Sequence, residues 1–432
     1  MKVLVIGSGG REHALVWKIA QSKSLTALHA APGSSAIAEL ATCHSDVPVG
    51  DLDGIVSLAK SQGIDLVVVG PEDPLASGLA DRLRDAGIAT FGPSAAAAQL
   101  EGSKAFAKAF MDRHGIPTAA HAVFDDADLA KAYVREMARP CVVKADGLAA
   151  GKGVVMCEDA TAASTAIDEM MLERRFGDAG RRVVVEEWLR GEEASYYAIT
   201  DGENIVTLAA AQDHKRALDG DLGENTGGMG AYSPTPAVSE AVEKKILERV
   251  VVPTIRGMAS DGMPYQGVLF VGLMMDAAGD PYVIEFNVRF GDPETQPLLA
   301  RMEGDLLPIL DAAARGTLDP STSIGWGDVA ICVVLASGGY PRDYETGKRI
   351  EGLEALGDDP NIIVFHAGTR RTASGEGFET AGGRVLGITA RGNSIAEARE
   401  RAYQAVERIR FDGLQYRRDI GARALDRTKA PG

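Results

Sequence analysis

The stretch KADGLAAGKGVV, residues 144–155, has the glycine and lysine content of a phosphate-binding loop. It follows a short apolar run, so Lys144 is expected at the end of a buried strand. It does not match the Walker pattern G-x-x-x-x-G-K-[ST], because Gly147 and Gly151 are one residue too close and Gly153 replaces the hydroxyl. The loop therefore either binds phosphate in another way or is only a tight turn.

The segments around this loop alternate between strand and helix patterns. Ser103 is expected to cap a helix that stops at Gly115. Strands are predicted near 120–124, 141–144, 153–156 and 182–189, and helices over 103–115, 127–138 and 160–172. The unit from about 122 to 188 is more similar to a nucleotide lid than to a complete domain.

The first hundred residues have a different pattern. Apolar runs at 2–6, 66–70 and 88–92 predict buried strands, and residues 11–21 and 75–86 predict helices. Strands that alternate with helices are typical of a parallel sheet with helices on both faces. We therefore expect an α/β N-terminal domain.

Further strands are predicted over 267–276 and 281–288, and a new strand-rich segment begins near residue 326 and runs to a final helix over 395–409. Composition changes near Gly102 and again near residue 325. The predicted domains are 1–101, 102–325 and 326–425.

Composition limits the possible partners. The chain has 432 residues, of which 45% are hydrophobic and 25% charged, and its net charge of 45 − 61 = −16 disfavours nucleic acids and anionic membranes. The four cysteines form no C-x-x-C pair, which disfavours a zinc site and a dithiol redox centre. No apolar window is long enough for a membrane span, and the N-terminal run does not resemble a signal peptide. We expect a cytoplasmic protein.

The segment GSGGREHA, residues 7–14, follows a strand and opens a helix, so its free N–H groups can hold an anion. The dinucleotide fingerprint requires glycine at position 12, where this chain has Glu12. NAD binding is therefore disfavoured. The turn of Gly9 and Gly10 either binds a phosphate or is shaped only for packing.

The segment VIEFNVRFGDPETQ, residues 283–296, carries the clearest chemical pattern. Strand alternation places Glu285, Asn287 and Arg289 on one face and Ile284, Phe286 and Val288 on the other. A carboxylate, an amide oxygen and a guanidinium on one face suit a metal–polyphosphate complex. The alternative is a half-exposed strand with polar residues outward, but the polar tail RFGDPETQ favours a site.

Three other segments carry candidate residues. Lys104 and Lys144 can reach phosphate, although either alone is more often a solvated charge. In VVVEEWLRGEEAS, residues 183–195, an apolar strand leads into acidic residues that either present main-chain groups to an adenine or are solvated surface. The polar loop 212–234 begins with QDHKR and is long enough to suggest function.

Together these segments identify a family. GGREHA, QLEGSKAF, KADGLAAGKGV, EEASYYA, QDHKRA, NTGGMGAYSP, IEFNVRFGDPETQP, GGYP and GGRVLGITA occur in this order and resemble the phosphoribosylamine–glycine ligases, also called glycinamide ribonucleotide synthetases. The resemblance covers the chain from Met1 to about Leu425. It implies a Rossmann-like N-terminal domain, central ATP-grasp domains and a small C-terminal α+β domain.

The resemblance also implies roles for particular residues. Glu285 and Asn287 correspond to ligands of Mg²⁺ or Mn²⁺, and Lys144 and Arg289 to catalytic groups. The nucleotide-binding set that it implies is Lys104, Lys144, Gly151, Lys152, Gly153, Glu186, Glu187, Leu189 and Glu193. The substrate-binding set is Gly9, Gly10, Asp213, Lys215 and Arg289. The loop GLAAGKG is then a mobile flap over ATP rather than a Walker loop.

The implied reaction joins glycine to 5-phosphoribosylamine with cleavage of ATP to ADP and phosphate, through glycyl phosphate, in purine biosynthesis. Small-molecule substrates are the expected partners, with a monomer expected and a dimer as the alternative. Another ATP-grasp ligase or carboxylase is the first rival interpretation, and an NAD-dependent oxidoreductase is the second.

Three positions depart from the family pattern. Ser8 replaces the asparagine of GNGG, Glu224 the proline of GPNTGG, and Val288 the cysteine of EFNCRF. We expect Glu224 to add a charge near the site and Val288 to have little effect. The strand VLFVGLMM, residues 268–275, has no acidic metal ligand, so a second tightly bound metal ion is disfavoured.

Overall fold

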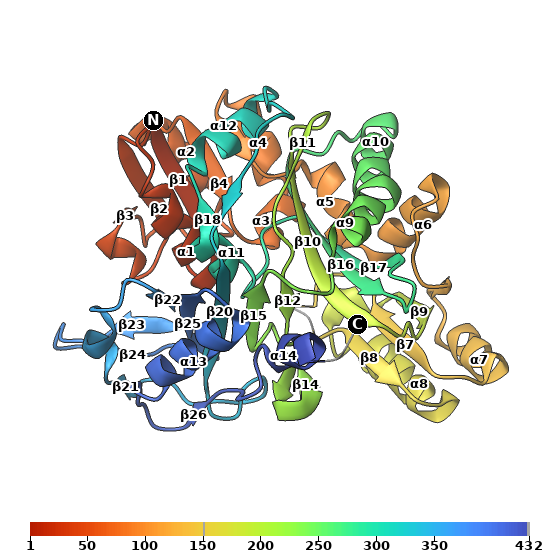
Figure 1. Cartoon of the computed structure of the whole chain (residues 1–432). Coiled ribbons are helices and arrows are strands. Elements are labelled where there is room, and N and C mark those ends of the chain that lie inside the picture. The colour runs from red at the N-terminus through yellow and green to blue at the C-terminus, as the bar shows by residue number, and fades with distance from the viewer. Residues whose placement is uncertain (150–151, 430–432) are drawn as a thin grey trace.

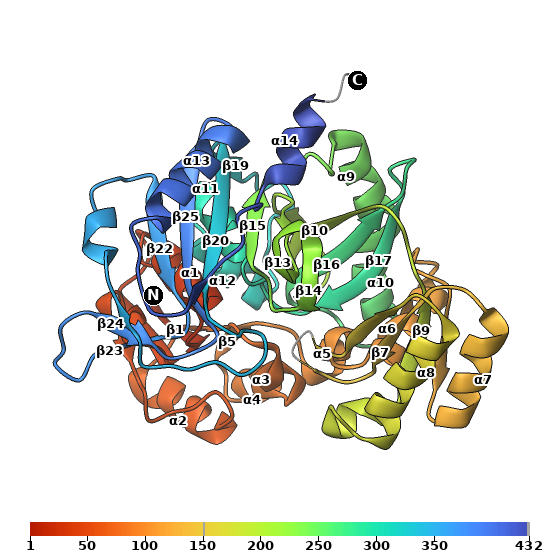
Figure 2. The ribbon, with the colours of Figure 1, turned by 90° about the horizontal axis from the view of Figure 1, so that it is seen from below.

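The computed structural model describes residues 1–149 and 152–429. In both views the N-terminal and C-terminal regions lie on one side of the molecule and the lid, residues 121–187, lies on the other (Figures 1 and 2). A long antiparallel sheet lies between them, so the site is built where three regions of the chain meet. Within the described residues, the structure has no helix with the length and apolar character that a membrane crossing requires.

The N-terminal region is a parallel sheet with strand order β3-β2-β1-β4-β5, the Rossmann-like order. Residues 3–6 of its central strand are fully buried, which explains their continuous apolar sequence. Its elements are β1 Lys2–Gly7, α1 Gly10–Ile19, β2 Ala27–Pro32, β3 Thr42–Cys43, α2 Leu52–Gln62, β4 Leu66–Val69, α3 Glu72–Ala76, α4 Leu79–Asp85, β5 Ala89–Phe91 and α5 Ala95–Gly102. The single helix predicted over 75–86 is wrong, because Gly78 adopts φ 87° and separates α3 from α4.

The lid is an antiparallel sheet of order β6-β9-β7-β8 that packs on two helices. Its elements are β6 His121–Phe124, α7 Ala127–Met137, β7 Cys141–Ala145, β8 Val154–Cys157, α8 Ala160–Ile167 and β9 Val183–Glu187. The helix α6 Lys104–His114 precedes the lid, and Ser103 caps it through a hydrogen bond from the Phe106 N–H, as predicted. The antiparallel pairing of β7 with β8 places the glycine loop at the end of a hairpin.

The central sheet has the order β11-β10-β16-β17. Its strands are β10 Glu192–Thr200, β11 Ile205–Thr207, β16 Gly267–Met275 and β17 Pro281–Asn287, and α9 Glu240–Ile246 and α10 Val252–Ser260 lie between β11 and β16 in sequence. The register of β16 with β17 shifts between Gly272 and Leu273, where Glu285 and Val283 are the successive partners. Ile284 is therefore an extra residue in a β-bulge.

The C-terminal sheet has the order β12-β15-β20-β25-β22 and takes its first two strands from the middle of the chain. Its strands are β12 Gln212–Asp213, β15 Gly230–Ser233, β20 Val329–Ser337, β22 Ile362–His366 and β25 Arg384–Gly392, with β26 Leu414–Gln415 beside β20. A hairpin of β13 Arg216–Leu218 and β14 Leu222–Asn225 projects between β12 and β15. Smaller sheets contain β18 Met302–Glu303, β19 Gly325–Trp326, β21 Arg349–Ile350, β23 Thr369–Arg371 and β24 Phe378–Thr380.

Three helices complete this region. The helix α12 Leu307–Arg315 precedes the C-terminal strands. The helix α13 Ile395–Val406 is followed by α14 Ala422–Lys429, which was not predicted from the sequence. The helix α11 Thr295–Arg301 is buried at every residue and contacts α1 as well as β15, β20 and β25. It therefore joins the N-terminal region to the C-terminal sheet.

Candidate functional site at the meeting of three regions

Three lysines from separate elements gather around β17. Lys144 is almost fully buried at the end of β7, where its Nζ lies 2.9 Å from Glu186 Oε2 and donates to the Ile284 carbonyl at 3.0 Å. Lys104, in the first turn of α6, donates to the Gly147 carbonyl at 3.1 Å. Burial lowers the pKa of Lys104, and the charge of Lys144 adds to that effect.

The third lysine, Lys215, reaches the carboxylate that was predicted to bind metal. Its Nζ lies 3.4 Å from Glu285 Oε1 and 3.5 Å from Glu193 Oε2. Lys215 is the main cause that lowers the pKa of Glu285 to about 2. We call Lys104, Lys144, Lys215, Glu186 and Glu285 the lysine half of the site.

The strand β17 presents its polar residues differently from the prediction. Because of the bulge, Ile284 lines the same small cavity as Glu193 and Lys215, so its predicted place on the opposite face is wrong. Phe286 and Val288 do enter the core, as predicted. Asn287 is buried, and its Nδ2 has no hydrogen-bond partner among the residues that the structure describes. Such an atom is costly unless a ligand or water pairs with it.

Arg289 follows β17 and contacts the N-terminal region. Its guanidinium lies 3.2 Å from Glu72 and 3.1 Å from Glu101, and its cation stands over the Phe270 ring. Burial alone would lower the pKa of Arg289, because it disfavours the charged guanidinium. The negative charges of Glu101 and Glu72 have a larger effect and raise this pKa. Burial also raises the pKa of Glu101 to about 7. Arg289 thus sits beside the site with its charge already paired.

The acidic segment after β9 divides into two environments. Glu186 is buried between Lys144 and Lys108, and within residues 1–149 and 152–429 its second oxygen, Oε1, has no partner. Glu187 is half-buried beside Arg139, and Leu189 is also half-buried. Besides its main-chain groups, this segment therefore has one buried carboxylate oxygen, Glu186 Oε1, that a ligand can contact.

The glycine loop lies only partly within the described residues. Gly151 lies outside them. Lys152 donates from Nζ to the Pro341 carbonyl at 3.2 Å, away from the other lysines. A Cβ on Gly153 would lie 2.7 Å from that of Ala149, so this glycine is needed for the turn itself.

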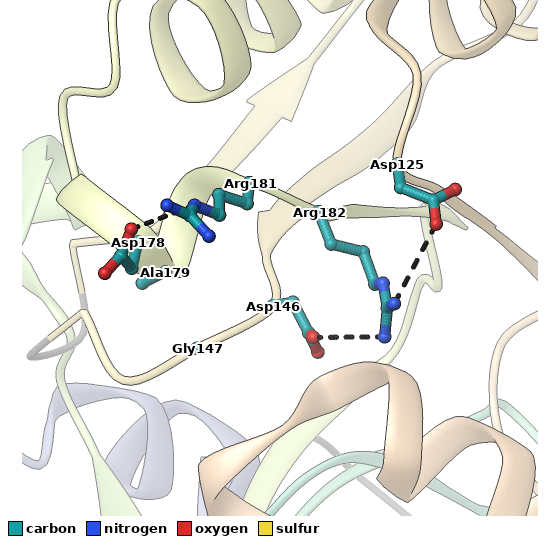
Figure 3. Close-up of a pocket in the computed structure, with 7 residues that line it drawn as sticks. All are labelled: Asp125, Asp146, Gly147, Asp178, Ala179, Arg181 and Arg182. Carbon is teal, nitrogen blue, oxygen red and sulfur yellow. Dashed lines mark ion pairs between the residues drawn. The ribbon is translucent and has the colours of Figure 1, made fainter.

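Beside this loop is a hollow of about 240 Å³, shown in Figure 3. Arg182 lies between Asp125 and Asp146, and Arg181 points to Asp178. Asp146 is largely buried and the other four side chains are more exposed, but all five are already paired, so none of them needs a ligand. Its link to the site is Gly147, whose carbonyl accepts from Lys104.

A second group of polar residues carries negative charge and lies beside the first, since Ser195 of β10 and Glu285 of β17 both pair with Gly272 of β16. Asp213 ends β12, and its Oδ1 is buried without a partner. Glu294 precedes α11 and accepts from the Ser195 hydroxyl at 3.0 Å. The Tyr197 hydroxyl is buried nearby, also without a partner. We call Asp213, Glu294, Ser195 and Tyr197 the carboxyl half of the site.

The predicted glycine turn closes the site from the N-terminal side. The Glu12 carboxylate accepts from the Gly9 N–H at 2.8 Å, so an acidic side chain already occupies this turn. A Cβ on Gly10 would lie 2.9 Å from Gln296 Nε2, which shows a close contact with the first turn of α11. The turn therefore has a packing role, and the Gln296 Oε1 atom beside it has no partner.

Several residues of this site were not assigned from the sequence. Asp292 binds Arg384 at 2.9 Å and accepts from Gln296 at 2.9 Å, and Glu101 and Glu294 contact other site residues. These residues lie in quoted segments whose polar density was the available signal. Two neighbours of Asp213 point elsewhere. His214 is buried against the Gly230 carbonyl and Gly421, and Arg216 donates to Gly223.

The arrangement can bind a polyanion and a small polar molecule side by side. The lysine half supplies cations and a carboxylate whose low pKa keeps it ionised, while Asn287 supplies an amide. These are suitable donors for a phosphate and its divalent ion. No cluster of three metal-binding His, Cys, Asp or Glu side chains occurs within residues 1–149 and 152–429. Glu285 and Asn287 are the oxygen donors that match a Mg²⁺ ion completed by phosphate and water.

Comparisons with known proteins agree with this geometry. Family models match for the N domain of phosphoribosylglycinamide synthetase over residues 1–101, its ATP-grasp (A) domain over 102–295 and its C domain over 330–423. Phosphoribosylamine–glycine ligases of Allochromatium vinosum and Vibrio cholerae are 51% and 50% identical to the chain, each over 100% of both chains.

Solved structures give the same result. The crystal structure of phosphoribosylamine–glycine ligase from Thermotoga maritima has a TM-score of 0.85 at 33% identity and covers 97% of this chain and 100% of its own. A biotin carboxylase from Campylobacter jejuni has a TM-score of 0.74 at 15% identity, covers 100% of this chain and 95% of its own, and shares only the fold. The resemblance seen in the sequence is confirmed: the chain belongs to the phosphoribosylamine–glycine ligase family, with Rossmann-like, ATP-grasp and C-terminal domains.

Proposed function

We propose that the protein is an ATP-dependent ligase that joins glycine to 5-phosphoribosylamine and forms glycinamide ribonucleotide, ADP and phosphate. The observation that carries the proposal is the convergence of Lys104, Lys144 and Lys215 on Glu285, beside buried polar atoms that have no protein partner. Family membership and the names of the relatives support this choice of substrates.

The lysine half suits ATP and a divalent ion. Lys104 and Lys144 would bind phosphate oxygens, and Glu285 and Asn287 would hold Mg²⁺ or Mn²⁺, which when bound neutralises phosphate charge. Glu186 Oε1 is buried without a partner among the described residues and would accept from a purine amino group. Main-chain groups near Glu187 and Leu189 and the side chain of Glu193 would complete the nucleoside contacts.

The chemistry divides into two displacements. The glycine carboxylate attacks the γ-phosphorus of ATP, which forms glycyl phosphate and releases ADP. The amine of phosphoribosylamine then attacks the carbonyl carbon and expels phosphate. Arg289 and Lys144 would stabilise charge on the transferred group, so that positioning and electrostatics supply the catalysis. The flap 144–155, with Gly151, Lys152 and Gly153, would exclude water from the acyl phosphate.

The phosphoribosylamine site is inferred at the contact of the three regions. Gly9 and Gly10, Gln296 and Arg384 border it, and Asp213 and Lys215 separate it from the nucleotide. The unpartnered Gln296 Oε1 supports a polar ligand at this position. The cytoplasmic location and the monomeric state stay predictions from the sequence.

A coupled ADP-release assay tests the function. Glycine, freshly generated phosphoribosylamine, ATP and Mg²⁺ are supplied together and each is then omitted in turn. We expect ADP release only with both substrates and a ribonucleotide product by mass spectrometry. ADP release that requires bicarbonate instead of glycine would contradict the proposal and favour an ATP-grasp carboxylase.

A further inference from the structure

The antiparallel hairpin of the lid brings together two cysteines that are far apart in the sequence. Cys141 begins β7 and Cys157 ends β8, and the two residues are direct partners in the register of these strands. Figure 1 shows the two strands side by side in the lid. The sequence has no C-x-x-C motif, so this pairing arises only from the fold. We call Cys141 and Cys157 the lid thiol pair.

The register places the lid thiol pair within the reach of a disulfide bond. Directly opposed residues of antiparallel strands have Cα atoms about 4.5 or 5.5 Å apart, depending on whether the two residues are hydrogen-bonded. A disulfide joins residues whose Cα atoms are about 4.4–6.8 Å apart. Both thiols are free, and they share a hydrogen bond, so the two sulfur atoms already face each other. A bond between them therefore requires only a small approach of the two strands.

The two thiols of the pair differ in acidity. The hydrogen bond from Cys157 lowers the pKa of Cys141, and the same hydrogen bond, followed by burial, raises the pKa of Cys157. Burial raises the pKa of the other two cysteines, Cys43 and Cys332. The thiolate is the reactive form of cysteine. By acidity, Cys141 is therefore the nucleophile among the four thiols, and Cys157 lies beside it as the resolving thiol.

An oxidant reaches the pair through the edge of the lid sheet. Both cysteines are fully buried in the lid core. The strand β8 is an edge strand in the order β6-β9-β7-β8, and exposed residues flank the pair, with Pro140 before Cys141 and Glu158 after Cys157. Local opening of a structure costs less free energy than global unfolding. Opening of β8 therefore admits a small molecule such as hydrogen peroxide.

We propose that Cys141 and Cys157 are a redox modification site, at which hydrogen peroxide converts the two thiols into a disulfide that ties β8 to β7. The Cys141 thiolate attacks one peroxide oxygen, the O–O bond breaks, and the leaving hydroxide takes up the proton that Cys141 had released. The Cys157 thiol then attacks the sulfur of the Cys141 sulfenic acid, which forms the S–S bond and releases water. Two thiols are oxidised, and one peroxide is reduced to two water molecules.

The disulfide changes the mobility of the hairpin that carries the glycine loop. Lys144 pairs with Val154 next to the loop, and the lid thiol pair lies at the opposite end of the same two strands. A cross-link that closes a loop limits the open states of the chain. Oxidation therefore holds β8 against β7, and a dithiol reductant releases it. This inference does not depend on the proposed reaction.

The first experiment oxidises the full-length wild type with hydrogen peroxide and removes the excess with catalase. The protein should lose two of its four free thiols, with a fall of about 2 Da in mass. Peptide mapping should recover Cys141 linked to Cys157, and dithiothreitol should restore both thiols. Amide hydrogen exchange in β8 should slow by about 10- to 100-fold in the oxidised protein.

Variants with one thiol removed test the two roles. In Cys157→Ala, Cys141 has no resolving partner, so peroxide should leave a sulfenic acid that dimedone labels. In Cys141→Ala, Cys157 should remain a free thiol at the same peroxide concentration, because its pKa is raised. Cys43→Ser, at the half-buried thiol of the N-terminal region, is the matched control and should form the same cross-link as wild type.

Oxidation of Cys43 without a link between Cys141 and Cys157 would overturn the assignment. A link that forms in urea but not in the native protein would also overturn it, because the register of β7 with β8 would then play no part. A linked protein with unchanged exchange in β8 would overturn the effect on the hairpin. Thermal unfolding of each variant confirms that the compared proteins are folded.

Discussion

The lysine half and the carboxyl half lie side by side on the central sheet, where Glu285 and Ser195 both pair with Gly272, but they balance charge in opposite ways. In the lysine half each cation already has a protein acceptor, as Lys144 has Glu186 and Lys215 has Glu285. In the carboxyl half Asp213 Oδ1 and the Tyr197 hydroxyl are buried with no partner. A polyanion entering the first half must exchange partners with existing ion pairs, whereas a cation entering the second half satisfies atoms that are otherwise unpaired.

The largest effect is expected from a substitution in the lysine half. Glu285→Ala should reduce ligase turnover by about 10³-fold or more, because Lys215 loses one of its two carboxylate partners and the divalent ion loses a ligand. Steady-state ADP release measures the loss, and circular dichroism checks the fold. Asp280→Ala, one residue before the same strand and paired with Lys245 and Arg249, is the control and should stay within about twofold. Near-normal turnover in Glu285→Ala would remove Glu285 from the metal role.

The second effect tests the residue between the halves. Arg289→Met leaves Glu101 without a salt bridge and Glu72 with only Arg11 at 3.8 Å, so the free energy of unfolding should fall by about 3–5 kcal/mol. Urea denaturation measures this change. Arg289→Lys retains the charge and should lose less stability. Equal losses in the two variants would mean that guanidinium geometry, and not charge, is what the two carboxylates require.

A third variant fills the carboxyl half. Gly228 has φ 110°, and a Cβ there would lie 2.4 Å from Pro293 Cδ. Gly228→Ala should lower kcat/KM for glycine at least tenfold and cost about 1–3 kcal/mol of stability. Gly220→Ala separates strain from contact, because Gly220 has φ 68° but nothing within 4 Å. That control should lose some stability and no activity.

The fourth prediction uses pH to sharpen the contrast. Burial, followed by the charge of Glu294, raises the pKa of Asp213, and burial raises the pKa of Glu294. The folded protein therefore holds a proton on the Asp213–Glu294 pair that the unfolded chain has released, so this pair makes stability fall as pH rises above about 4.3. Glu294→Gln should therefore gain in melting temperature relative to wild type as pH rises from about 5.5 to 8.5.

Glu285→Gln should behave differently in the same pH series. The folded pKa of Glu285, about 2, and its ordinary value of 4.5 both lie below this range. Its effect on the melting temperature should then be the same at both pH values. Parallel pH profiles for Glu285→Gln and Glu294→Gln, measured by differential scanning fluorimetry, would contradict the distinction between the halves.

The smallest effect is expected outside both halves. Glu224, at a departure from the family pattern, lies 2.7 Å from Arg342, and Arg342 is largely exposed. Exposed pairs contribute little, so Glu224→Gln should cost less than about 1 kcal/mol and leave KM for glycine unchanged. Arg342→Gln should give the same result, since both variants remove one exposed pair.

Local patterns predicted most of the elements but not the contacts between regions. Apolar runs identified β1, β4, β16 and β17, because buried strands require continuous or alternating apolar residues. The bulge at Ile284 could not be predicted, since it depends on pairing with β16. The strands β12 and β15 were not assigned to the C-terminal sheet, because β15 joins it through β20, which begins nearly one hundred residues later.

The same limit applied to the site. Glu285, Asn287 and Lys144 were predicted from strand alternation and family motifs, and Lys144 contacts the main chain of β17 at Ile284. Glu101, Glu294 and Arg384 could not be assigned to the site from the sequence, because their partners are distant along the chain. These partners are Arg289, Ser195 and Asp292, respectively. Residue type and spacing along the chain do not contain that information.

The helix α11 gives the molecule a property that its division into family segments conceals. It begins directly after Glu294, is buried along its whole length, and touches α1 and the C-terminal sheet at once. If one segment were exchanged between relatives, the packing of α11 against each of its neighbours would have to be restored. Substitutions beside Glu294 and substitutions that alter the packing of the regions against α11 are therefore expected to occur together.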